Sequence, residues 1–193
     1  MTTTGVVRAG GFTYSTRMPL AVFMRAVNVG VHQRFQPALL AKQLAHLDVV
    51  NIGAAGTLVV RARASEAAVR REILKRLPFE AEMMICQGRD VTKVISDDPF
   101  PRVAPPGDVR RMVTVLAGPP RARPRLPLIE PPGAAWQARV VAIVGRLMLS
   151  FWRPDRRKLL DVNKVAEEAL GVRATTRNWN TFLKVAAVLE GSG

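Results

Sequence analysis

The sequence is poor in the residues that build metal centres, disulfides and nucleophilic pairs. Its 193 residues include one cysteine, Cys86, and two histidines, His32 and His46. A single cysteine excludes a disulfide within the chain, and neither histidine stands at a metal-ligand spacing from the other or from Cys86. We therefore expect no metal, no cofactor and no catalytic residue of these types. Cys86 is expected to be a packed thiol, as is typical of a reducing cytoplasm.

Long apolar runs are also missing. No stretch approaches the roughly 20 uninterrupted apolar residues that a membrane-spanning helix needs. Residues 1–18 contain no apolar segment of signal-peptide length and are interpreted as a flexible tail. We therefore expect a cytoplasmic protein that does not enter a membrane.

Acidic residues are scarce relative to basic ones, at 15 Asp and Glu against 29 Lys and Arg, which gives a net charge of +14. The imbalance is greatest between residues 101 and 160, where 12 basic residues stand against 3 acidic ones. Such a field attracts nucleic acid and other phosphates without reading sequence, although a basic protein with no such partner fits the composition equally well. The candidate nucleic-acid contacts are Arg121, Arg123, Arg125, Arg153, Arg156 and Arg157.

Hydrophobic periodicity predicts an α+β fold whose first subdomain, residues 19–98, has the order β-α-β-β-α-β. This is the split βαβ, ferredoxin-like pattern, in which both helices cover one face of a four-stranded antiparallel sheet. On the sheet face that the helices leave open, the third strand has no aromatic residue. RNA-recognition motifs stack bases on such aromatics, so this fold is not expected to be one. The predicted strands are 20–24, 48–53, 56–63 and 79–86, and the predicted helices are 36–47 and 65–77.

The remaining sequence predicts a second, less regular α+β subdomain, residues 99–190, packed on the first. A helix over 89–98 stops at Pro99, and a strand follows at 110–118. An arm rich in Pro and Arg, residues 118–133, has too many prolines for a helix or a central strand. A hairpin turning near Gly145 and helices over 155–170 and 173–189 complete the subdomain.

Arg177 is unusual if it lies in the first turn of the last predicted helix. A cation there opposes the helix dipole, unless an anion binds beside it. Thr175 or Thr176 would cap the helix, and Asn178 would add a donor. The alternative interpretation pairs Arg177 with one of the protein's own carboxylates.

Two stretches resemble the signature segments of the bacterial domain-of-unknown-function 1697 family, FMRAVNVG at 23–30 and ATTRNWNTFLKVAAVL at 174–189. DDPFP at 97–101 is similar to a third family segment. The chain departs from the family at 54–57, where Ala-Ala-Gly-Thr replaces the usual Gln-Ser-Gly-Asn, and at 157–158, where Arg-Lys replaces Ser-Lys. The resemblance implies a compact α+β protein with ferredoxin-like parts, and it supplies no established activity.

The function that these observations favour is non-catalytic binding of an anion, either a phosphate-containing small molecule or a nucleic-acid backbone. An enzyme acting on a phosphorylated or carboxylated small molecule, and a protein-interaction or homodimer module, are the alternatives, with a monomer or a homodimer left open. The expected ligand site lies where the two subdomains join. Its residues would be Arg25, Asn28, Lys158, Thr176, Arg177 and Asn178.

Overall fold

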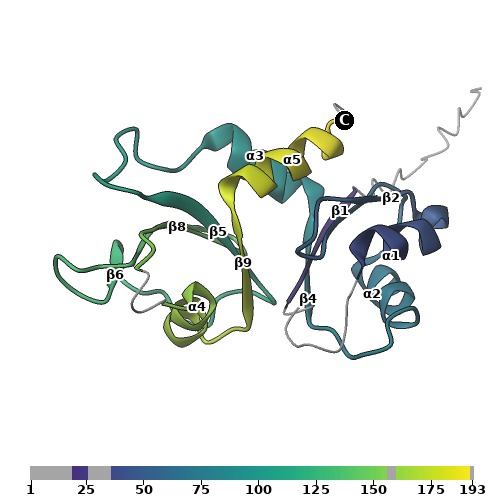
Figure 1. Cartoon of the computed structure of the whole chain (residues 1–193), viewed down its shortest axis with the longest axis horizontal. Helices are drawn as coiled ribbons and strands as arrows, with labels where there is room; N and C mark the ends of the chain where they lie inside the picture. The colour runs from purple at the N-terminus through teal and green to yellow at the C-terminus, as the bar shows by residue number, and fades with distance from the viewer. Residues whose placement is uncertain (1–18, 26–35, 156–159, 192–193) are drawn as a thin grey trace, which may run out of the picture.

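The computed structural model describes residues 19–25, 36–155 and 160–191 (Figure 1). Within these ranges the chain forms two antiparallel sheets and five α-helices, which confirms a mixed α+β fold. Four of the predicted site residues, together with the tail at 1–18, lie outside the described residues. The four are Asn28, Arg156, Arg157 and Lys158.

The first sheet has the strand order β2-β3-β1-β4, with every neighbouring pair antiparallel. Helices α1 and α2 follow the first and third strands, as the periodicity predicted, and Ser65 caps α2 by accepting from the Ala68 amide at 3.2 Å. A short 3-10 turn, Ala45–Leu47, extends α1. The elements are β1 (Leu20–Met24), α1 (Pro37–Gln43), β2 (Val49–Asn51), β3 (Thr57–Val60), α2 (Glu66–Leu74) and β4 (Met83–Gln87).

Both faces of the first sheet are covered, which explains the uninterrupted apolar run of β1. Leu20 and Val22 lie in the cluster that includes α1 and α2 residues. Ala21 and Phe23 point the other way, into a cluster that includes residues of the last helix. The face of the sheet that α1 and α2 do not cover is therefore buried against the last helix.

The second sheet has the order β6-β7-β8-β5-β9 and carries helix α4 on one face. The hairpin of β7 and β8 turns at Gly145, and Gly171 ends α4 in a left-handed conformation (φ 67°), both as expected. The predicted arm contains one short edge strand, β6. The elements are β5 (Arg110–Leu116), β6 (Leu128–Glu130), β7 (Ala138–Val144), β8 (Leu147–Trp152), α4 (Val162–Leu170) and β9 (Ala174–Asn178).

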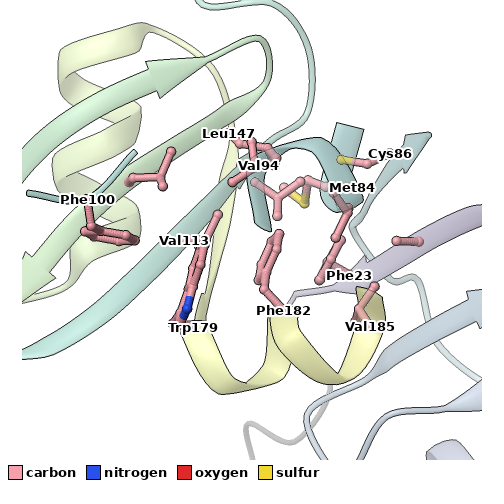
Figure 2. Packing of buried hydrophobic residues seen from close by; sticks show 14 of the residues in the cluster. Phe23, Met84, Cys86, Val94, Phe100, Val113, Leu147, Trp179, Phe182 and Val185 are labelled. Atoms are coloured by element: carbon pink, nitrogen blue, oxygen red, sulfur yellow. The ribbon is translucent and has the colours of Figure 1, made fainter. Parts of the chain in front are cut away.

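Helices α3 (Gly88–Asp97) and α5 (Trp179–Leu189) lie together between the two sheets (Figure 1). Figure 2 shows Phe23 of β1 beside Phe182 of α5, and their rings stack with centroids 5.1 Å apart. Val113 and Leu147 of the second sheet belong to the same cluster. The two halves of the chain therefore share one hydrophobic core.

The prediction of a helix from residue 173 is wrong for its first residues. Residues 174–178 form strand β9, whose Arg177 pairs with Val113 of β5. Helix α5 begins only at Trp179, because Asn178 is its N-cap and accepts from the Thr181 amide at 2.8 Å. Thr175 and Thr176 of β9 are β-branched, and such residues favour a strand over a helix.

Three smaller differences concern element ends and one side chain. Strand β4 begins at Met83 rather than at residue 79, and α4 begins at Val162 rather than at residue 155. Helical periodicity predicts Leu183 in the apolar stripe of the last helix, but its side chain is 43% exposed. The inward face of α5 uses Val185 instead.

Candidate functional site

The guanidinium of Arg177 joins the two sheets, and each of its five N–H groups has a protein acceptor. All five acceptors are neutral oxygens, from the end of β1, the β2–β3 turn, β3 and the residues beside Arg177 itself. Nε donates to Thr57 Oγ1 at 2.9 Å, Nη1 to Thr175 Oγ1 at 3.0 Å and to the Thr176 carbonyl at 2.9 Å, and Nη2 to the carbonyls of Met24 at 2.5 Å and Ala55 at 2.7 Å.

This arrangement changes the role that the sequence suggested for Arg177. The residue is not at a helix start, and no carboxylate among the described residues neutralises it. Burial lowers the pKa of Arg177 from 12.5 to about 10, because desolvation disfavours the charged form. With every donor engaged, Arg177 can attract a nearby anion through its charge, but it offers no free N–H group to a ligand.

Arg25 lies at the same junction and is held by the protein's own acids. Its guanidinium donates to Glu167 and lies 3.7 Å from Glu82. Arg173 bridges the same two acids, at 2.9 Å from Glu82 and 3.3 Å from Glu167. Burial alone would raise the pKa of Glu167, but the hydrogen bonds from Arg25 and from the Ala174 amide lower it.

Thr176 and Asn178 are also engaged within the protein. The hydroxyl of Thr176 lies 2.8 Å from that of Thr114, and the Asn178 side chain accepts from the amide and the hydroxyl of Thr181. The structure therefore brings Arg25 and Arg177 to one junction, where their contacts hold the two halves together. The Thr176 hydroxyl and the Asn178 side chain instead contact residues of the second half. Asn28 and Lys158 belong to the part of the predicted site that lies outside the described residues.

A hollow that sequence reasoning missed lies between the β2–β3 turn and α5, with a volume of about 610 Å³. We call it the turn–helix pocket. Lys184 lines it, is exposed, and has no ion pair among the described residues. The sequence contained one indication of this pocket: the spacing of Thr181, Lys184 and Val188 places them on one face of α5. The lining residues are Val50, Asn51, Ile52, Gly53, Ala54, Ala55, Thr181, Lys184, Ala187 and Val188.

The four arginines of the predicted nucleic-acid surface that the structure describes fall into two groups. Arg121, Arg123 and Arg125 are exposed along the arm and have no carboxylate partner within the described ranges. Arg153 is fixed, because it lies 4.1 Å above the ring centre of Trp136 and donates to the carbonyls of Ala134 and Pro106.

A mainly apolar groove of about 510 Å³ runs beside the arm, between the loop at 101–106 and residues 126–127. Arg139 lines it, and Arg102 directly precedes the groove residue Val103, which is 84% exposed. None of the described residues that line this groove is acidic. They are Pro101, Val103, Ala104, Pro105, Pro106, Leu126, Pro127, Arg139, Val141 and Phe151.

Metal and thiol chemistry receive no support from the described part of the chain. Residues 19–25, 36–155 and 160–191 contain no group of three or more His, Cys, Asp or Glu side chains placed to hold a metal ion. Cys86 is buried, as predicted, and burial raises the pKa of its thiol to about 12. None of the helices in these ranges is long and apolar enough to span a bilayer.

Comparisons with known proteins agree with this architecture. The structure is similar to that of a conserved bacterial protein, SP0830, from Streptococcus pneumoniae, with a TM-score of 0.55 and 16% sequence identity over 89% of this chain and 98% of the other. Its likeness concerns the fold alone. No curated protein matches the chain. Residues 18–143 match the family described as "Protein of unknown function (DUF1697)", and the chain therefore belongs to this family.

Proposed function

We propose that this protein binds nucleic acid without catalysis, through the sugar-phosphate backbone. The binding surface would be a set of five arginines that we call the arginine arm surface. The observation that carries the proposal is their lack of carboxylate partners among the described residues. The five are Arg102, Arg121, Arg123, Arg125 and Arg139.

Many other arginines have their charge compensated inside the protein. Arg25 pairs with Glu167, Arg61 with Asp48 at 2.8 Å, and Arg111 with Asp98 at 3.0 Å. An arginine held in this way gains less from a phosphate, because it must first give up its own partner. The arginine arm surface gives up no such partner, so its field acts outward.

The shape of the arm supports the same conclusion. Arg121, Arg123 and Arg125 occupy alternate positions, which in extended chain places neighbouring side chains roughly 6–7 Å apart. Pro124 between Arg123 and Arg125, with the flanking prolines at 119, 120 and 127, restricts the backbone, so less conformational entropy is lost when the arginines bind. The apolar groove beside Leu126 offers surface to bases, and Arg139 lines it.

The test is a salt titration of oligonucleotide binding. Fluorescence anisotropy would follow labelled single-stranded DNA and RNA of about 20 nucleotides between about 50 and 200 mM salt. We expect the logarithm of the affinity to fall linearly with the logarithm of the salt concentration. Three phosphate contacts account for a slope of about 2 on a single strand, so a triple Arg→Gln variant at 121, 123 and 125 should lose about that much slope.

A matched control removes three unpaired basic side chains from the other half of the molecule. The variant Lys42→Gln, Arg63→Gln, Arg71→Gln changes the net charge equally but leaves the arm intact. It should keep most of the affinity and slope. Absence of binding at low salt, binding that is indifferent to salt, or equal losses in the two triple variants would each contradict the proposal.

Three finer assignments accompany this function as proposals. The first subdomain is proposed to be ferredoxin-like, supported by its β-α-β-β-α-β order and by the strand order β2-β3-β1-β4. A cytoplasmic location is proposed from the free thiol of Cys86. We also propose that the boundary between the two subdomains lies between residues 98 and 99.

A further inference from the structure

We infer that the turn–helix pocket binds a small organic anion, a carboxylate or a phosphate ester that carries an apolar group. This site is separate from the arginine arm surface. It is lined by the β2–β3 turn and α5, whereas the arm lies against the second sheet. The inference therefore does not depend on nucleic-acid binding.

The pocket has the size and composition of a small-molecule site. Its volume of about 610 Å³ falls within the range of roughly 300–1,000 Å³ that is usual for ligand pockets. Apolar side chains form most of its lining, among them Val50 of β2, Ile52 directly after β2, and Ala187 and Val188 of α5. An apolar group of the ligand would pack against these walls.

The charge around the pocket selects an anion. No acidic residue lines it, and the ammonium group of Lys184 is exposed there without an ion-pair partner in the described ranges. A second positive charge lies directly behind the wall, because Arg177 Nη2 donates to the carbonyl of the lining residue Ala55 at 2.7 Å. No carboxylate among the described residues pairs with Arg177, so no ion pair offsets its positive charge beside the pocket.

The two cations would have different roles. Lys184 is flexible and has free N–H groups, so it can contact the anion directly. Arg177 has no free donor and would act at a distance, by raising the electrostatic potential of the turn. Thr181 lines the pocket, but its hydroxyl already donates to Asn178 at 2.9 Å and is not available to donate to an anion.

The experiment is an NMR titration of the full chain with four matched fragments. Phenyl phosphate and benzoate are the anionic probes, benzyl alcohol is the neutral one, and benzylamine is the cation. For the two anions we expect saturable shifts of the amides at 51–55 and 181–188. The neutral and cationic probes should bind more weakly or not at all, and the two anions together distinguish a phosphate from a carboxylate preference.

Substitutions then locate the contact. Lys184→Ala should weaken binding of the anions by about three- to fivefold, the loss expected for one partly exposed charge pair, and Lys184→Arg should retain it. Lys42→Ala removes another exposed lysine, on α1, and should have no effect. The amide spectra of the variants also show whether the fold is intact.

Clear outcomes overturn the inference. Shifts confined to other surfaces, equal affinity for benzyl alcohol and benzoate, or unchanged anion affinity in Lys184→Ala would each do so. The outcome is separable from that of the nucleic-acid proposal, because the triple arm variant should bind phenyl phosphate normally. Lys184→Ala should in turn bind oligonucleotides like the unaltered protein.

Discussion

Arg177 Nη2 lies 2.5 Å from the carbonyl oxygen of Met24, a residue 153 positions earlier in the chain. This contact joins the two segments that resemble family signatures, one at the end of β1 and the other along β9. The two segments meet in a polar region beside the shared hydrophobic core, which we call the polar seam. The seam explains why so many polar residues precede α5.

Replacing Arg177 should destabilise the protein strongly. Arg177→Lys keeps the charge but supplies at most three donors for five acceptors, so buried oxygens lose their partners. We expect a loss of about 2–4 kcal/mol in the free energy of unfolding, measured by urea denaturation at neutral pH. Arg63→Lys, at an exposed position, is the control and should change stability by less than about 0.5 kcal/mol. A similarly small effect at position 177 would show that the seam is not essential to the fold.

Glu167 should make stability sensitive to acid. Its pKa is lower in the folded protein than the ordinary value of 4.5, so its stabilising contribution is complete above that value. The contribution is lost as the pH falls through the lowered folded pKa, when the carboxylate paired with Arg25 takes up a proton. The free energies of unfolding of the unaltered protein and of Glu167→Gln, measured with urea, should differ clearly at pH 7, and the difference should shrink as the pH falls below 4.5. Glu168→Gln, 68% exposed on the same helix, should show no such pH-dependent difference.

Gly88 should resist even a single added methyl group. A Cβ at this position would lie 2.7 Å from Leu189 Cδ2 and 2.8 Å from the carbonyl oxygen of Pro19, where α3 packs on α5 and β1. We expect Gly88→Ala to cost about 1–3 kcal/mol through overpacking. Gly118→Ala is the matched control, because a Cβ added there would meet no described atom within 4 Å. Thermal unfolding of both variants measures the effect, and equal melting temperatures would rule out the close packing at Gly88.

Local patterns in the sequence were sufficient for the elements that contain their own signals. The apolar run at 20–24, the cap at Ser65 and the glycine after α4 act over a few residues, so their positions were predictable. The net positive charge of the arm is likewise a property of composition. These features require no knowledge of which segments meet.

Residues 174–178 show where local reasoning fails. Taken alone, this short polar segment is compatible with the start of a helix. Only the pairing of β9 with β5 makes it a strand. Because of the same pairing, Arg177 does not donate to a ligand as expected but links the two halves of the chain through hydrogen bonds. The pairing also positions α5 on the face of the first sheet that α1 and α2 do not cover.

The sequence by itself therefore determined the α+β class, the element order of the first half and the excess of basic residues, because these follow from short-range periodicity and charge. Only the tertiary structure decided which polar groups are satisfied, which face of each sheet is covered and where a pocket remains. Those outcomes depend on hydrogen bonds and packing between residues more than 100 positions apart, such as Arg25 with Glu167 and Arg177 with Thr57.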